Sequence, residues 1–158
     1  MTQRLDGKQI AAEMREEIRQ DVAALTAEGL QPGLGVLLVG DDPASRSYVA
    51  AKEKACAEAG IYSREIKLPA SASKAEILEV VAQVNAAPEI HGILVQLPLP
   101  DSRIEEEVLN TILPEKDVDG FHPVNVGRMM LGLPAYLPCT PHGILHMLQR
   151  AGHTMKGK

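Results

Sequence analysis

Apolar residues at the start of the chain recur with a helical period. Asp6 precedes them as a helix cap, Gln9 stands where its side chain reaches back to that cap, and Gly29 follows as a helix stop. We therefore expect a helix between Asp6 and Gly29. Its apolar face consists of Ile10, Met14, Ile18, Val22 and Leu25.

Three short runs with the composition of strands come next, and helical patterns separate them. Residues 33–39 are continuously apolar, as in a buried parallel strand, whereas residues 62–68 are more polar and are expected near a sheet edge. Residues 91–95 form the third run. Between the runs, helices are predicted over 43–60 and from a Ser73–Glu76 capping box onward. This alternation predicts the α/β class, as a three-layer fold with a parallel sheet between flanking helices.

The last third of the chain contains more turn-forming residues. Short helices are predicted over 104–109 and 124–131, and a further helix begins near Thr140. Thr140 is expected to cap that helix, with Pro141 at its first helical position and Gly152 at its end.

Polar segments follow the first and third predicted strands, at the edge of a parallel sheet where ligands bind. Residues 40–52 and 96–100 should therefore line one crevice. The first segment contains Tyr48 and Lys52, which a helix places on one face because they are four residues apart. A tyrosine ring can stack on a flat ligand, and an amine can carry protons. Alone, the pair is weak evidence, because a solvated helix face with an extended lysine gives the same pattern.

The same spacing of Tyr48 and Lys52 occurs in short-chain dehydrogenases. Those enzymes need a glycine-rich dinucleotide turn after a strand, and no GxGxxG follows any predicted strand here. The glycines at 33 and 35 precede a strand, which is the wrong place.

Gln96, Asp117 and Asp119 are further candidates, and each has a structural alternative. Gln96 ends the third strand before Leu97 and Pro98, in a turn that prolines stiffen. Its amide either forms a hydrogen bond in a binding site or binds the backbone carbonyls of its own loop. The two aspartates either form turns with nearby backbone or offer a carboxylate to the N–H groups of a flat heterocycle.

Composition and charge narrow the class of protein. The chain has 158 residues, enough for one domain with a core, and a formal net charge of −5 without any long basic run. We therefore expect no nucleic-acid partner. The longest apolar run is too short to cross a bilayer, so no membrane partner is expected.

Cysteine and histidine placement gives no metal signature. Cys56 and Cys139 are far apart and form no CxxC pair, which argues against a disulfide framework or a zinc site and fits a reducing cytoplasm. Cys139 is expected to be a small buried residue. His142 and His146 share a helical face but lack the glutamate of the metalloprotease pattern, so no metal is expected.

Four segments occur in a characteristic order and together carry more information than any of them singly. They are GDDPASRSYVAAK at 40–52, HGILVQLPLP at 91–100, PEKDVDGF at 114–121 and PCTP at 138–141. Across essentially the whole chain, they resemble the bifunctional methylenetetrahydrofolate dehydrogenase/methenyltetrahydrofolate cyclohydrolase family.

The resemblance implies a role for each matching residue. Tyr48 is similar to the residue that stacks on the folate, Lys52 to the catalytic lysine, and Gln96 to the residue that hydrogen-bonds and tunes that lysine. Asp119 resembles the carboxylate that binds the amino edge of the pterin. Leu97 and Pro98 belong to the substrate-binding motif after the third strand.

The resemblance also implies a domain organisation. Residues 1–158 correspond to the catalytic, folate-binding domain, of the amino-acid-dehydrogenase-like N-terminal type, with 140–158 leading into an NADP-binding Rossmann domain that this chain does not contain. The family implies NADP as the cofactor of the full-length enzyme, no metal, a homodimer and a cytoplasmic location. The sequence leaves open NADP or NAD as the preferred cofactor. It also leaves two alternatives, a pterin-binding module without catalysis and an unrelated α/β domain in which Tyr48 and Lys52 are only surface residues.

Overall fold

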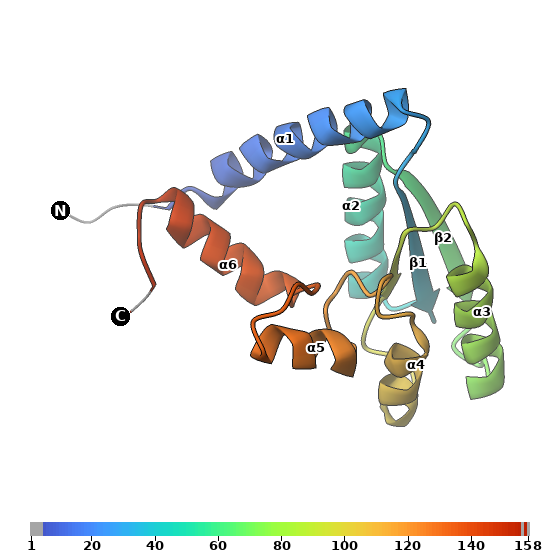
Figure 1. Ribbon diagram of the computed structural model, residues 1–158. Coiled ribbons are helices and arrows are strands. Elements are labelled where there is room, and N and C mark those ends of the chain that lie inside the picture. Colours follow the sequence, from blue (N-terminus) through green and yellow to red (C-terminus); the bar gives the residue numbers. More distant parts are fainter. Residues whose placement is uncertain (1–4, 156, 158) are drawn as a thin grey trace.

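Three parallel strands form the centre of the molecule, in the order β2-β1-β3 (Figure 1). The computed structural model describes residues 5–155 and residue 157. The central strand is β1 (Gly33–Val39), and β2 (Tyr62–Leu68) and β3 (Gly92–Val95) lie on its two sides. The α/β class, the parallel pairing and the edge position of β2 are confirmed. The third strand begins one residue later than predicted, and the ring of His91, just before it, accepts a hydrogen bond from the Gly33 amide.

Helices connect and cover the strands. They are α1 (Gly7–Ala27), α2 (Pro43–Ala59), α3 (Lys74–Ala86), a 3-10 turn η1 (Ser102–Ile104), α4 (Glu105–Thr111), α5 (Pro123–Met130) and α6 (Cys139–Arg150). The capping box predicted for α3 is present, and the other segments predicted to be helical contain helices.

Both faces of β1 are buried, which explains its continuous apolar run. Leu37 and Val39 pack on one face in a cluster that includes Ile77 of α3 and Val108 of α4. Residues of the opposite face, such as Val36, pack in a cluster with Val49 of α2. The sheet therefore lies between α2 on one side and α3 with α4 on the other, as the predicted three-layer arrangement requires.

The first helix extends away from this core (Figure 1). Asp6 caps it by accepting hydrogen bonds from the amides of Lys8 and Gln9. The predicted reach of the Gln9 side chain back to the cap is wrong, because its amide donates to Glu13 instead, at 2.9 Å. Of the predicted apolar face only Val22 is buried, where the end of α1 lies over α2.

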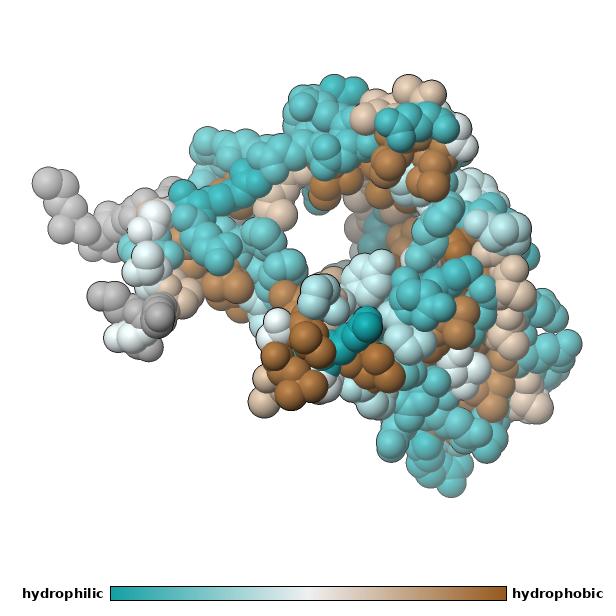
Figure 2. All heavy atoms as spheres, in the orientation of Figure 1, coloured by the Kyte–Doolittle hydropathy of each residue, from teal (hydrophilic) through white to brown (hydrophobic). Residues whose placement is uncertain are grey.

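The other end of α1 meets α6 through ion pairs. The Arg150 guanidinium lies 2.5 Å from Glu17 and 3.7 Å from Glu13. Figure 2 shows that the space framed by α1, α6, α5 and the sheet domain is open in this view. Within the described part of the chain, no helix has both the length and the apolar character needed to span a membrane.

The start of α6 differs from the prediction. Thr140 was expected to cap the helix, but the helix already begins at Cys139, so Thr140 lies inside its first turn. The residue at the cap position is Pro138, whose extended backbone leads into the helix without any side-chain cap. The predicted stop is confirmed, since Gly152 has a left-handed φ of 80° just beyond the last helical residue.

Candidate functional site

Lys52 and Gln96 meet at the carboxyl end of the sheet. Lys52 projects from the third turn of α2, and Gln96 directly follows β3. The Lys52 Nζ donates to the Gln96 Oε1 at 2.9 Å. The Gln96 Nε2 in turn donates to the Leu97 carbonyl at 2.7 Å, which fixes the amide with its oxygen toward the lysine. The two polar segments predicted to line one crevice are thus brought together.

Tyr48 lies one helical turn before Lys52. The Lys52 Nζ is 5.8 Å from the centre of the tyrosine ring, within the range of a cation–π contact. Tyr48 is 64% exposed, although the sequence contains only four aromatic residues of the Phe, Tyr and Trp types. An exposed ring beside an amine is available to stack on a planar ligand.

The two residues after Gln96 differ in their surroundings. Leu97 is half-buried and packs against the core cluster, whereas Pro98 is exposed, and the peptide bond between them is cis. Leu97 therefore contributes its carbonyl to Gln96, and the ring of Pro98 is exposed two residues after Gln96.

Asp117 has a structural role within its loop. Its side chain is only 1% exposed and accepts hydrogen bonds from the amides of His122 (2.9 Å) and Phe121 (3.4 Å) and from the Asn125 side chain (2.9 Å). Asn125, which is itself buried, also donates to the Pro114 carbonyl. Of the turn-forming and ligand-binding roles left open by the sequence, the turn-forming role holds for Asp117.

Asp119 lies close enough to Lys52 for the two charges to interact. Burial is the main cause that raises the pKa of its half-buried carboxyl, and the nearby Asp117 adds to it. The positive charge of Lys52 opposes that rise, and so does the neighbouring Cys139 thiol. Asp119 therefore belongs to the same cluster as Lys52 and Gln96.

Cys139 was missed as a member of this cluster. It was expected to be buried, but it is exposed, because it stands in the uncapped first turn of α6. Its thiol donates to the Val118 carbonyl at 3.4 Å. Loss of water around the sulfur, together with the charge of Asp119, raises the pKa of the thiol. The PCTP segment that contains Cys139 was recognised in the sequence as a helix start and as one of the four family segments, but it gave Cys139 no role in the site.

Gly120 permits this approach of two segments that are distant in the sequence. It has a φ of +69°, which favours glycine. A Cβ at this position would lie 2.6 Å from the Leu137 carbonyl carbon and 2.8 Å from the Pro138 nitrogen. The segment that leads into α6 therefore crosses directly over the Asp119 loop.

The histidine pair does not form a metal site with other ligands. The rings of His142 and His146 lie on one face of α6 with centroids 4.4 Å apart, as predicted. Among the described residues, no group of three or more His, Cys, Asp or Glu side chains is arranged to hold a metal ion. Cys56 is buried, and burial raises the pKa of its thiol.

Neither α2 nor α3, the helices that follow β1 and β2, offers its N-terminus to a phosphate. The Asp42 carboxylate caps α2 by accepting from the Ser45 amide at 2.8 Å. Ser73 and Glu76 close the first turn of α3, where Glu76 accepts from the Ser73 amide at 2.7 Å. Carboxylates at these positions repel a pyrophosphate, so these residues do not fit a dinucleotide of the Rossmann kind.

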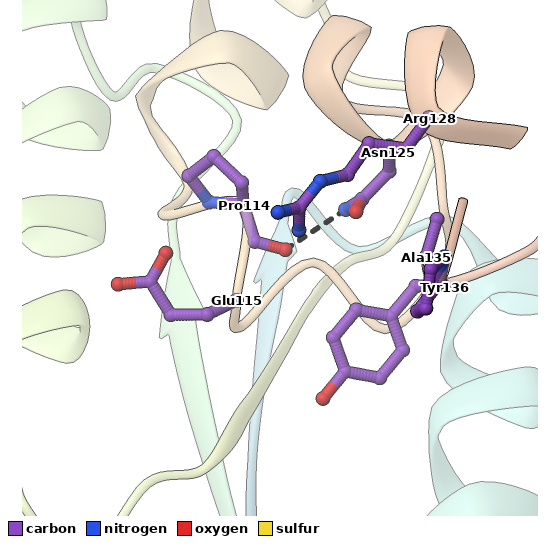
Figure 3. A pocket seen from close by; sticks show the side chains of 7 residues that line it. Pro114, Glu115, Asn125, Arg128, Ala135 and Tyr136 are labelled. Carbon is purple, nitrogen blue, oxygen red and sulfur yellow. Dashed lines mark hydrogen bonds between the residues drawn. The ribbon is translucent and has the colours of Figure 1, made fainter. Parts of the chain in front are cut away.

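A separate cavity lies on the other side of the Asp117 network. It has a volume of about 330 Å³. Figure 3 shows that Arg128 and Tyr136 extend beside it and that the Asn125 amide donates to the Pro114 carbonyl at its edge. None of the side chains of the Lys52 cluster lines this cavity.

A family model and the curated relatives of this chain point to the same family. Residues 5–119 match the sequence model of the family described as tetrahydrofolate dehydrogenase/cyclohydrolase, catalytic domain. The bifunctional protein FolD of Geobacillus thermodenitrificans is 56% identical over 154 residues, which cover 98% of this chain and 54% of that protein. The chain thus spans about half the length of the curated relatives it matches.

Solved structures agree with the sequence comparison. The bifunctional FolD methylenetetrahydrofolate dehydrogenase/cyclohydrolase of Campylobacter jejuni has a TM-score of 0.92 and 44% identity, covering 94% of this chain and 53% of that one. The FolD enzyme of Trypanosoma brucei, solved with NADP and an inhibitor, has a TM-score of 0.91 and 33% identity, covering 97% and 53%.

Proposed function

The chain belongs to the tetrahydrofolate dehydrogenase/cyclohydrolase family, and on that premise we propose that it supplies the folate site and the catalytic lysine of a bifunctional enzyme. That enzyme oxidises 5,10-methylenetetrahydrofolate to the 5,10-methenyl form and hydrolyses this product to 10-formyltetrahydrofolate. The observation that carries the proposal is the contact between Lys52 and Gln96, with the Asp119 carboxyl beside them.

Three groups bind the folate in this proposal. The exposed ring of Tyr48 stacks on its planar part, and Asp119 accepts hydrogen bonds from the amino edge of the pterin. Leu97 and Pro98 form the wall next to Gln96. Support comes from Asp117, whose carboxylate is occupied by donors of its own loop, so that Asp119 is the carboxylate left for a ligand.

Lys52 moves the protons of the hydrolytic step. Water adds to the methenyl carbon and loses one proton. The bond from that carbon to one ring nitrogen then breaks as the nitrogen gains a proton and the new hydroxyl loses its own, so that a formyl group forms and one proton is released overall. An amine that is neutral for part of the cycle can accept the first proton and deliver the second. Gln96 holds the Lys52 Nζ in place because the Leu97 carbonyl fixes its amide.

NADP is the proposed hydride acceptor of the dehydrogenase step, and a metal plays no part. The starts of α2 and α3 carry carboxylates that do not suit the phosphates of a dinucleotide, so the proposal places the NADP site in another part of the enzyme. Residues 1–158 act as the folate-binding catalytic domain, with 140–158 leading toward that part. The proposal also includes a cytoplasmic homodimer that acts in one-carbon metabolism and supplies purine biosynthesis, with no nucleic-acid or membrane partner.

Two measurements on the protein test the proposal. Calorimetry with folate should give saturable binding, and added 5,10-methenyltetrahydrofolate should be hydrolysed faster than in buffer. Binding without hydrolysis would favour a pterin-binding module that lacks catalysis. A protein that shows neither would contradict the proposal that this chain supplies the folate site and the catalytic lysine.

A further inference from the structure

The turn that carries Asp119 is closed by a single residue, Asp117. Asp119 is the third residue of this turn, in which the Gly120 amide donates to the Asp117 carbonyl at 3.3 Å. The Asp117 carboxylate accepts hydrogen bonds from the amides of Phe121 and His122, which follow the turn. Main-chain and side-chain oxygens of Asp117 therefore fix the backbone on both sides of Asp119.

The backbone of Asp117 is attached to the sheet. Asp117 forms an isolated parallel bridge with Ile93 of β3, and the Ile93 amide donates to the Lys116 carbonyl at 2.7 Å. This pairing fixes where Asp117 begins the turn, but it does not by itself fix the direction of the Asp117 side chain. The direction of the carboxylate therefore depends on a donor from outside the turn.

Asn125 of α5 supplies that donor. Its side chain is buried, and its Nδ2 donates to the Asp117 Oδ2 at 2.9 Å and to the Pro114 carbonyl at 2.8 Å. Both partners are acceptors, so this position requires one atom that donates two protons, as an amide nitrogen does. A hydroxyl donates one proton and a carboxylate donates none. The contacts therefore give a chemical reason for an asparagine at position 125.

We propose that Asn125 is a positioning residue for the ligand of Asp119. By holding the Asp117 carboxylate, Asn125 sets the turn from which the Asp119 side chain projects. Asn125 is only 2% exposed, so it acts through Asp117 and not by its own contact with a ligand. The effect of Asn125 on folate rests on the proposed function, but its effect on the turn does not.

Amide hydrogen exchange followed by NMR tests the effect on the turn without folate. In Asn125→Ala the His122 amide should exchange about five- to tenfold faster relative to the amides of β1, because its acceptor is no longer held in place. Asn85→Ala is the matched control. The Asn85 side chain also binds backbone, at the Thr111 carbonyl (2.7 Å) and the Leu113 amide (3.0 Å), so its loss should destabilise the fold but leave the relative exchange of His122 unchanged.

Folate binding measured by calorimetry connects the turn to the ligand. The folate dissociation constant of Asn125→Ala should rise about two- to fivefold, because a hydrogen bond that holds the turn is lost. Asn85→Ala should bind folate with the wild-type affinity, although urea unfolding should show both variants to be less stable. A residue that only stabilised the fold would leave the affinity of the folded protein unchanged in both variants.

Asn125→Asp is the variant of the same shape. Its carboxyl would lie against the Asp117 carboxylate, and two such close carboxyl groups hold one proton between them, which restores the hydrogen bond. That proton is lost as the pH rises. The folate affinity of Asn125→Asp, taken as a ratio to the wild type, should therefore be highest at low pH and fall toward that of Asn125→Ala as the pH rises. The charged residues that line the cavity beside position 125, Arg128 and Glu115, are the same in every variant.

Each outcome decides one of the two claims. Folded Asn125→Ala with unchanged relative exchange of His122, or with wild-type folate affinity, would overturn the proposal. If Asn125→Ala does not fold, an affinity ratio of Asn125→Asp that is independent of pH would overturn it instead. Faster His122 exchange in Asn125→Ala, in a series where even the wild type binds no folate, would support the role of Asn125 in the turn and defeat the proposed function.

Discussion

Replacing Asp117 with alanine should destabilise the fold far more than replacing Asp119, which lies two residues further along the same loop. The Asp117 carboxylate is 1% exposed and accepts three N–H groups, two at 2.9 Å and one at 3.4 Å. Alanine would leave the amide of His122 and one N–H of Asn125 without an acceptor in the interior. Asn125 would keep its second bond, to the Pro114 carbonyl.

The magnitude follows from these contacts. A hydrogen bond to a charged group contributes about 1.5–3 kcal/mol, and two of the three bonds to Asp117 have short, favourable distances. The long bond from Phe121 adds little. Because the bonds share one acceptor and are not additive, we expect Asp117→Ala to lower the free energy of unfolding by about 3–5 kcal/mol. That is a large part of the stability of a domain of this size.

Urea unfolding followed by circular dichroism measures this loss. Asp119→Ala is the matched control, because it removes a carboxylate two residues away that is only half-buried. The control should change the free energy of unfolding by less than about 1 kcal/mol. Equal losses in the two variants, or a loss below about 1 kcal/mol for Asp117→Ala, would refute the assignment of Asp117 as the structural member of the pair.

Three further changes test the site and its surroundings. Asp119→Ala should raise both the Michaelis constant and the dissociation constant of folate inhibitors about tenfold or more, since it removes charge-assisted hydrogen bonds; a larger loss of affinity in folded Asp117→Ala would mean that the other carboxylate binds the pterin. Gly120→Ala should destabilise the protein more than Gly132→Ala. The two glycines share a φ near +70°, but of the two only Gly120 has backbone within 3 Å of the added Cβ. Equal urea midpoints for the two variants would show that the segment before α6 moves away from the added Cβ at no cost in stability. Calorimetry of the 158-residue chain with NADP⁺ should show no saturable binding, because Asp42 and the Ser73–Glu76 box occupy the helix starts, and micromolar affinity would reveal a site of another kind.

Local sequence signals were sufficient for most of the fold. The strands and helices were recognised because each has a clear period and clear stop signals, as in the apolar run of β1 and the capping box of α3. The errors lie at helix starts, where two local interpretations compete. The Gln9 side chain donates to Glu13, one turn further along α1, and not to the cap. Helix α6 begins before Thr140 because Pro138 already holds the chain in an extended conformation.

The sequence located the candidate site only in part. The meeting of Lys52 with Gln96 followed from the rule that strand ends in a parallel sheet share one edge. The different roles of Asp117 and Asp119 could not be read from their spacing, because they depend on Asn125 and Cys139, which come from later helices. Contacts of this kind are set by how the chain crosses itself at Gly120.

The hydrolysis of 5,10-methenyltetrahydrofolate by a Lys52→Met variant tests the central claim most directly. The enzyme that carries this chain should lose about 10²–10⁴ in hydrolytic rate while its folate dissociation constant stays close to that of the wild type, because the change removes a proton carrier and leaves Tyr48 and Asp119 in place. The control is Lys54→Met on the same helix. The Lys54 side chain is 78% exposed and lies at the long distance of 3.9 Å from Glu58, so this variant should hydrolyse the substrate at the wild-type rate. A Lys52→Met enzyme with near-normal hydrolytic turnover would contradict the account and remove Lys52 from the mechanism.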